Sequence, residues 1–179
     1  MKVNHITPIN ILDYPYHQKL KDDLLPLLKY HHFKDLGHTN VKATHTEWDW
    51  QKDHTQVKKI KLWVLNEAKK NSHHAAIDEK QASELRVVNF WANVYNKGDY
   101  ANMHTHIPSY ISFSYFLKSK WYYHSLVFTD SMKKVRPKEG RVVIFPSYLR
   151  HHVSKHKFTP QRITLSGNIA IVKQWSNAR

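Results

Sequence analysis

The stretch "PKEGRVVIFPSYLRHHV" (residues 137–153) sets the pattern of the C-terminal half of the chain. A turn-like segment that ends at Gly140 leads into β-branched and aromatic residues, and this run stops at Phe145 and Pro146. Such a sequence is typical of a short strand that follows a turn. A second short segment then places His151 at the end of a strand. We therefore expect a strand here, followed by a candidate metal ligand.

Similar strand-like segments lie on both sides of this stretch and are separated by turn-like pieces such as "NKGD" (96–99). They are "LRVVNFWANVY" (85–95), "SYISFSYFL" (109–117), "WYYHSLVFT" (121–129) and "RITLSGNIAIV" (162–172). Five or more short strands at this spacing predict a β-sandwich or barrel.

The first half of the chain has a different pattern, with helical spacing of its apolar residues. "HQKLKDDLLPLLKYHH" (17–32) predicts one helix, which Pro26 is expected to break or kink. "DHTQVKKIKLWVLNEAKKN" (53–71) predicts a second helix, with Asp53 as its N-cap. A short strand near Val3–Ile11 is also expected.

These patterns predict a mainly β protein with N-terminal helices. A chain of 179 residues is long enough for one domain with a proper core and too short for two comfortable ones. We expect a single domain over residues 1–179, with a mainly helical support region over 1–84. An all-β jelly roll over 85–179 would carry the functional site.

The composition restricts the chemistry of any site. The chain has no cysteine, so disulfides and thiolate metal sites are excluded, and a metal would need His, Asp or Glu ligands. No apolar run is long enough for a transmembrane helix, and the first residues do not read as a signal peptide. We expect a soluble intracellular protein, cytoplasmic by default, with no membrane partner.

The net charge of +14 is unevenly distributed. Residues 101–179 contain thirteen Lys and Arg but only two carboxylates, Asp130 and Glu139. A field of this sign attracts anions such as nucleic acids, acidic peptides or small dicarboxylates. Lysines and aromatic residues lie close together in "KSKWYYHS" (118–125), which adds some weight to nucleic-acid binding, although no nucleic-acid-binding motif is present.

Three histidines have the spacing of a metal site. His104 and His106 lie two residues apart in "NKGDYANMHTHIP" (96–108), and on an extended segment such residues point to the same side. His151, from a distant strand, would complete a triad that leaves coordination positions open. Arg162 follows eleven residues later and would direct a fixed cation at an anion bound beside the metal.

With these motifs, residues 91–168 resemble the iron(II)/2-oxoglutarate-dependent oxygenases, a superfamily built on the double-stranded β-helix. The chain looks closest to the prolyl-4-hydroxylase-like branch and its short "putative 2OG-Fe(II) oxygenase" members. "YNKGDYANMHTH" (95–106) is similar to the family's first motif. "HHV" (151–153) with Arg162 is similar to the last motif, and the stretch 137–153 matches the short members.

The resemblance implies a hydroxylase that uses Fe(II), 2-oxoglutarate and O2 on a cupin-like double-stranded β-helix. His104 and His151 carry over as iron ligands, and Arg162 as the partner of the distal carboxylate of 2-oxoglutarate. Tyr95 and Thr164 carry over as further co-substrate contacts. The implied substrate is a peptidyl or free amino-acid side chain, while the charge leaves an anionic surface or nucleic acid open.

His106 departs from the family pattern, which usually has Asp or Glu at this position. A neutral imidazole in place of an anion leaves the iron with one more unit of positive charge. If a carboxylate completes the site instead, the nearby candidates are Asp99, Asp130 and Glu139. We rank all three below His106.

Two other functions remain open from the sequence. A three-histidine cupin dioxygenase would use the same histidines without needing Arg162, but the glutamate of the cupin motif is absent. A non-enzymatic nucleic-acid-binding protein would use the basic surface, with structural histidines. The sequence does not indicate the oligomeric state. The histidines of the helical half are expected to be exposed: His38, His45, His54, His73 and His74.

Overall fold

Two antiparallel sheets form the body of the computed structural model, which describes residues 7–29, 31 and 40–172. The larger sheet has the order β1 (Asn10–Asp13), β9 (Arg141–Pro146), β6 (Ile111–Lys118), β11 (Arg162–Ile171), β4 (Leu85–Tyr95) and β3 (Thr44–His45). The smaller sheet has the order β2 (Val41–Lys42), β5 (Tyr100–His104), β10 (His151–Val153), β7 (Leu126–Phe128) and β8 (Lys133–Val135).

The strand order is that of a double-stranded β-helix. From β4 onward the chain crosses repeatedly between the sheets: β4, β6, β9 and β11 lie in the larger sheet, and β5, β7, β8 and β10 lie in the smaller one. Eight strands shared in this way between two sheets make a jelly roll. The predicted fold class is therefore confirmed, and each of the five predicted strand segments contains a strand.

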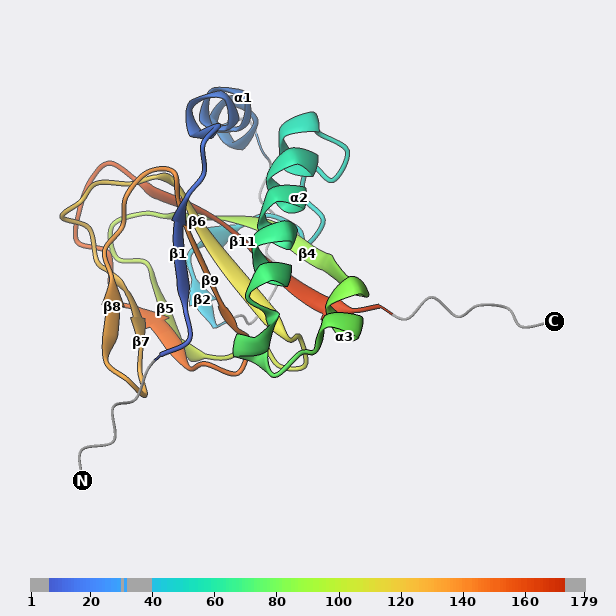
Figure 1. The fold of residues 1–179 in the computed structure, drawn as a ribbon. Helices are drawn as coiled ribbons and strands as arrows, with labels where there is room; N and C mark the ends of the chain where they lie inside the picture. The colour runs from blue at the N-terminus through green and yellow to red at the C-terminus, as the bar shows by residue number, and fades with distance from the viewer. Residues whose placement is uncertain (1–6, 30, 32–39, 173–179) are drawn as a thin grey trace.

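Helices cover the outer face of the larger sheet, where α1 (His17–Lys29) and α2 (Thr55–Lys70) lie against it (Figure 1). The 3-10 helix η1 (Ser72–Ala75) and α3 (Glu79–Ser83) follow α2. Leu20, Leu24 and Leu28 are spaced four residues apart on α1 and are all buried. Val57, Ile60, Val64 and Ala68 form the matching buried stripe of α2. The helices are thus held by apolar burial, about 1.5–3 kcal/mol for each large side chain.

The larger sheet serves two cores because alternate residues of a strand face opposite sides. Tyr115 and Ile144 belong to the cluster that packs with the helices. Phe116 and Phe145, each next to one of these, belong to the cluster between the two sheets. The second cluster supports the face on which the histidines lie.

Two expectations for the helices of the first half need correction. Pro26 does not break α1, which continues to Lys29 and buries Leu24 and Leu28 on either side of the proline. Asp53 is not the N-cap of α2: the Nδ1 atom of His54 accepts from the backbone N–H of Gln56 at 3.2 Å.

The N-terminal strand lies at Asn10–Asp13, later than the expected Val3–Ile11, of which residues 3–6 lie outside the described range. This strand, β1, is an edge of the larger sheet because it pairs with β9. Residues 41–45 also add the short edge strands β2 and β3. The N-terminal region thus extends both sheets as well as supplying helices.

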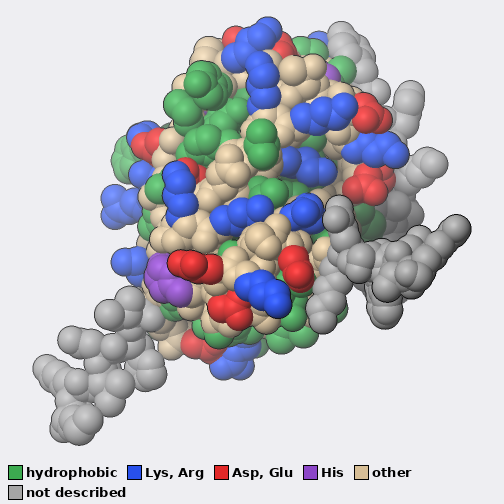
Figure 2. Space-filling model, turned by 45° about the vertical axis from the view of Figure 1, so that its right-hand side comes forward, with side chains coloured by type: hydrophobic (Ala, Val, Ile, Leu, Met, Phe, Trp, Pro, Cys, Tyr) green, Lys and Arg blue, Asp and Glu red, His purple; other side chains and the backbone are tan. Residues whose placement is uncertain are grey.

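The helix-covered side of the molecule carries mixed charge. Figure 2 shows Lys and Arg side chains on this face with Asp and Glu side chains among them. Two exposed ion pairs are Lys19 with Asp23 at 3.1 Å on α1 and Lys70 with Glu67 at 2.6 Å on α2. Within the part of the chain that the structure describes, no helix combines the length and apolarity needed to cross a membrane.

Candidate metal centre and co-substrate cavity

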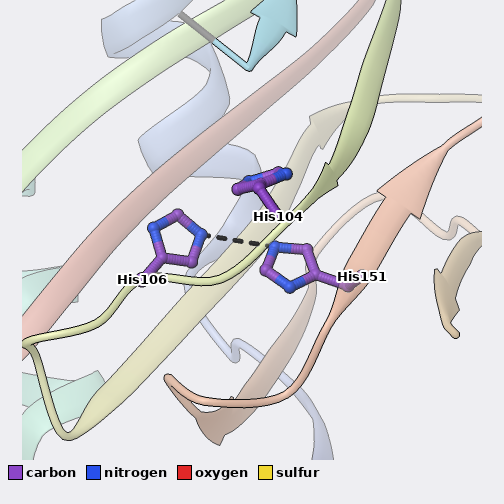
Figure 3. A group of neighbouring side chains, drawn as sticks. All are labelled: His104, His106 and His151. Atoms are coloured by element: carbon purple, nitrogen blue, oxygen red, sulfur yellow. Dashed lines mark hydrogen bonds between the residues drawn. The ribbon is translucent and has the colours of Figure 1, made fainter. Parts of the chain in front are cut away.

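Strand pairing brings the three histidines together. His104 ends β5 and lies directly opposite His151, the first residue of β10. His106 follows two residues later, and its backbone N–H donates to the carbonyl of Ser147 at 2.8 Å. Residues 45 positions apart in the chain therefore meet, and their rings converge (Figure 3).

The spacing of the three rings fits one metal ion. One ring nitrogen from each histidine lies within 4.8 Å of the others. The Nε2 atoms of His106 and His151 are 3.3 Å apart (Figure 3). Adjacent imidazole ligands at metal–nitrogen distances of about 2.1 Å lie about 3 Å apart. The pair therefore needs only a small adjustment to bind one ion.

Backbone carbonyls fix the tautomer of two of the rings. The Nδ1 atom of His104 is 2.7 Å from the carbonyl oxygen of Asn102, and that of His151 is 2.9 Å from the carbonyl oxygen of Leu149. Because a carbonyl can only accept, each Nδ1 carries the proton. Each Nε2 then has a free lone pair, as in metal-binding histidines whose other nitrogen is held by a hydrogen bond.

Burial keeps all three imidazoles neutral. Desolvation lowers the pKa of His104, lowers the pKa of His106 to about 3 and lowers that of His151 to about 4. The neighbouring rings of the cluster lower the pKa values of His106 and His151 further. The neutral imidazole is the form that binds metal, so the cluster does not need to lose protons near pH 7.

The carboxylates considered from the sequence have other partners. Asp130 pairs with Arg150, and Glu139 accepts from the Nζ atom of Lys21 at 2.6 Å. Asp99 accepts from a backbone N–H in its own turn at 2.7 Å. Among the described residues, the cluster of possible metal ligands consists of the three histidines and contains no carboxylate.

A ladder of paired side chains connects the histidines with Arg162. In the register of β4 with β11, Tyr95 lies opposite Arg162, Asn93 opposite Thr164, and Trp91 opposite Ser166. These are alternate residues of each strand, so they share one face. Together with the histidines they line one small cavity. The structure thus places the six predicted site residues around one cavity: Tyr95, His104, His106, His151, Arg162 and Thr164.

Arg162 is a buried cation with unused hydrogen-bonding capacity. Its side chain is 1% exposed, and one terminal nitrogen donates to the carbonyl of His124 at 2.8 Å. The guanidinium lies over the rings of Tyr95 and Phe116, with 5.3 and 5.1 Å to their centroids. Its Nε atom has no hydrogen-bond partner, and no described carboxylate pairs with it.

An anion in the cavity would satisfy this arginine. Burial of a charge without a counter-charge is costly, whereas a carboxylate matches the fork of a guanidinium. Burial also raises the pKa of the Tyr95 hydroxyl, which therefore stays protonated and able to donate. The donor set of the cavity thus fits an iron(II) ion at the histidines and a carboxylate of 2-oxoglutarate at Arg162.

Asn93 is a cavity residue that the sequence reading missed. Its Nδ2 atom donates to the hydroxyls of Thr164 and Ser166 at 3.4 and 3.3 Å, while its buried Oδ1 atom has no partner. The signal was present: counting back by twos from Tyr95 along the strand leads to residues 93 and 91. Asn93 therefore offers the cavity a free acceptor beside Thr164.

A wider, open cavity adjoins the first. The ladder continues into the open cavity as the pair Asn89 and Asn168. The residues that line both cavities are Val41, Trp91, Asn93, His104 and His106. The described residues that line the open cavity include no Lys, Arg, Asp or Glu. The open cavity can therefore admit an uncharged segment of a larger molecule to the histidines.

His45 lies in this open cavity, so the expectation that it is exposed is wrong. It is buried because β3 pairs with β4 and places His45 opposite Asn93. His54 and His74 are half-buried, and His73 is exposed as expected. His38 lies outside the described residues.

Comparisons with known proteins agree with this site. Residues 127–168 match a family model described as "Putative 2OG-Fe(II) oxygenase". This segment contains β8 to β10 and most of β7 and β11, including His151, Arg162 and Thr164. No match was found among curated proteins.

The fold is similar to that of solved prolyl hydroxylases. A collagen prolyl hydroxylase from Paramecium bursaria chlorella virus 1, solved with 2-oxoglutarate, matches with a TM-score of 0.71 at 17% identity, over 93% of this chain and 97% of that one. A prolyl-4-hydroxylase from Pseudomonas putida matches with a TM-score of 0.68 at 10% identity, over 93% and 94%. A prolyl hydroxylase from Trichoplax adhaerens, in complex with a peptide fragment of hypoxia-inducible factor, matches with a TM-score of 0.66 at 10% identity, over 92% and 84%.

The family match, the fold and the histidine cluster agree with one another. Residues 127–168 match the "Putative 2OG-Fe(II) oxygenase" model, the fold is similar to the fold of solved prolyl hydroxylases, and the three histidines form a group that could hold a metal ion.

Proposed function

We propose that His104, His106 and His151 hold one iron(II) ion and that Arg162 binds the distal carboxylate of 2-oxoglutarate. The observation that carries this assignment is the single cavity between the histidines and the buried arginine. One end offers a set of neutral donors, and the other offers a cation without a counter-charge.

The remaining polar residues would orient the co-substrate. Tyr95 lies beside Arg162 and would donate its phenolic proton to the same carboxylate. Thr164 lies next along β11 on the same face and would donate its hydroxyl proton, while Asn93 holds that hydroxyl in place. Arg162 itself is held by the carbonyl of His124 and by the two rings beneath its guanidinium.

Bound iron(II) and 2-oxoglutarate supply the oxidative decarboxylation that activates O2 for hydroxylation of a substrate C–H bond. The protein contributes geometry and the exclusion of water. Because His106 is neutral, the histidine cluster supplies no negative charge. The carboxylate of 2-oxoglutarate would therefore supply the balancing charge, which should strengthen iron binding.

We further propose that the substrate is a peptidyl side chain that enters through the open cavity. This cavity reaches two of the histidines and is wide enough for a segment of chain. The likeness to prolyl hydroxylases, one of them solved with a bound peptide, supports this substrate class.

The three-histidine cupin alternative does not account for Arg162. A cupin would need the histidines alone, yet here a fully buried arginine lines the same cavity without a carboxylate partner among the described residues.

The intracellular location expected from the sequence stays a prediction.

Turnover of 2-oxoglutarate tests the proposal. Purified protein with iron(II), ascorbate and O2 should form succinate from 2-oxoglutarate, faster when a peptide substrate is added. The Arg162→Gln variant should need a much higher 2-oxoglutarate concentration, with Arg150→Gln, an exposed arginine, as the control. Iron-dependent turnover that does not require 2-oxoglutarate would instead support the cupin alternative.

A further inference from the structure

Two loops at the Arg162 end of the jelly roll form a surface that the proposed reaction does not use. Residues 119–125 connect β6 to β7, and residues 154–161 connect β10 to β11. They lie side by side, because the hydroxyl of Tyr123 donates to the carbonyl of Pro160 at 2.6 Å. We call these two segments the aromatic loops.

The aromatic loops carry cations and no carboxylate. Lys120, Lys155 and Lys157 are exposed, and none of them forms an ion pair with a described residue. Lys97, in the adjoining turn, is exposed too, and Asp99 of that turn is the nearby acid. This differs from the helix-covered face, where acidic and basic side chains are mixed (Figure 2).

Aromatic rings are exposed among these lysines. Trp121 is 75% exposed and Tyr122 is 44% exposed. Covering large aromatic rings of this kind lowers the free energy, so exposed rings favour binding of a ligand that covers them. The two rings contact each other edge to face, with 5.7 Å between centroids. The surface therefore presents flat apolar faces next to positive charge.

Less exposed rings hold this surface in shape. Phe158 stacks on Tyr123 at 5.4 Å with an interplanar angle of 17°, and it also contacts Tyr122 at 5.2 Å. His156 packs edge to face against Tyr123 at 4.7 Å. The exposed rings thus stand on an ordered cluster, which lowers the entropy lost when a ligand stacks on them.

We propose that the aromatic loops bind single-stranded nucleic acid. Unpaired bases stack on exposed aromatic rings, and lysines neutralise the adjoining phosphates. One ligand can therefore contact both the rings and the lysines. A lipid surface fits less well, because the aromatic loops contain no Leu, Ile, Val or Met to enter the acyl region. An acidic peptide would use the lysines and leave the rings uncovered.

This surface is separate from the opening of the site. Arg162 begins β11 beside the aromatic loops, and Asn168, in the open cavity, lies six residues further along that strand. Six residues of a strand span about 20 Å. The aromatic loops and the open cavity are therefore different surfaces, and the proposal stands apart from the proposed reaction.

Binding of a fluorescein-labelled twelve-nucleotide oligothymidylate, followed by anisotropy, tests the proposal. An abasic oligomer with the same number of phosphates separates stacking from charge. We expect the wild-type protein to bind the oligothymidylate about ten-fold more tightly than the abasic oligomer. Trp121→Ala should weaken oligothymidylate binding about ten-fold and leave abasic binding unchanged.

The lysines are tested with a charge-matched pair of double variants. Lys120→Ala with Lys157→Ala should weaken both oligomers and reduce the slope of log affinity against log salt by about 1.4, or about 0.7 for each phosphate that is no longer neutralised. Lys52→Ala with Lys59→Ala removes the same charge elsewhere on the surface and should change neither affinity by more than about two-fold. Circular dichroism would verify that each variant is folded.

Three results would overturn the proposal. Equal affinity for the two oligomers would show a charge effect without stacking. Equal losses in the two double variants would show a nonspecific response to net charge. Trp121-dependent binding to vesicles of phosphatidylserine and phosphatidylcholine, with no preference for oligothymidylate over the abasic oligomer, would assign the surface to lipid.

Discussion

At one end of the β4–β11 ladder Tyr95 and Arg162 are 4% and 1% exposed, whereas at the other end Asn89 and Asn168 are half-exposed. The buried end has a cation and hydroxyl donors around a small cavity, and the open end has uncharged side chains around a wide one. A small buried cavity suits one anion of fixed size, while an open cavity can admit part of a larger molecule. His104 and His106 line both cavities, and His151 lines the small one, so a metal ion at the three histidines would lie where the two cavities meet.

The largest effect on activity is expected from loss of a proposed iron ligand, because binding of both the co-substrate and the substrate would serve a reaction at the metal. His151→Ala removes a proposed iron ligand and should lower succinate formation by more than about 100-fold, because outer-sphere partners of metal ligands alone cost about 10–100-fold. The adjacent His152→Ala is the matched control, since that side chain contacts Thr129 instead of the cluster. Iron retained by the purified protein, measured by absorption spectroscopy, should fall in the first variant alone. Equal iron content in both variants would contradict the ligand assignment.

The next largest effect should be confined to the buried end. Arg162→Gln removes the charge that would meet the distal carboxylate, and a hydrogen bond to a charged group contributes about 1.5–3 kcal/mol. The dissociation constant of 2-oxoglutarate should therefore rise about 10- to 150-fold by calorimetry under anaerobic conditions. Iron affinity without 2-oxoglutarate should stay the same. A parallel loss of iron would show that Arg162 supports the metal centre and not the co-substrate.

A smaller change at the same end is expected from Thr164→Val, which removes one hydroxyl and keeps the branched shape. The affinity for 2-oxoglutarate should fall by about 2- to 10-fold, the range of one neutral hydrogen bond. Ser114→Ala, elsewhere in the lining of the same cavity, is a useful comparison. If Thr164→Val binds 2-oxoglutarate like the wild type, the hydroxyl serves the packing of Asn93 and does not contact the co-substrate.

The smallest effect on 2-oxoglutarate is expected at the open end. Trp48 is 47% exposed and packs edge to face on Trp91 at 4.7 Å, in the wall of the open cavity. Trp48→Ala should leave the affinity for 2-oxoglutarate within about two-fold, while it raises the KM for a peptide substrate several-fold. Trp121→Ala, on the aromatic loops, should change neither constant. A large effect of Trp48→Ala on 2-oxoglutarate would mean that the two cavities are not functionally separate.

The strand-rich half could be predicted because its spacing is local. Each candidate ligand lies at a strand end or two residues beyond it, and the alternation of a strand then decides which side chains share a face. That reasoning places His104 with His106, and Tyr95 in line with Asn93. The roles of these residues stay predictions, while their common cavity is a feature of the structure.

Pairing between strands that lie far apart in the sequence could not be predicted from local patterns. His45 lies in the open cavity only because β3 joins the edge of β4, a contact between residues 48 positions apart that no local pattern encodes. The prediction of Asp53 as the N-cap of α2 was wrong for a different reason. His54 and Asp53 are neighbours with competing acceptors, and Asp53 instead pairs with Lys58 at 3.4 Å.

The central claim is that a cluster of three neutral histidines holds iron(II) and that 2-oxoglutarate completes its coordination. An anaerobic titration tests this claim: iron(II) is added first and 2-oxoglutarate second, while the visible spectrum is recorded. The wild type should develop the weak charge-transfer band of a chelated keto acid, His106→Ala should lose it, and His106→Asp should retain it because a carboxylate can replace the imidazole. A wild-type protein that binds iron without developing the band, or a His106→Ala variant that keeps it, would contradict the account.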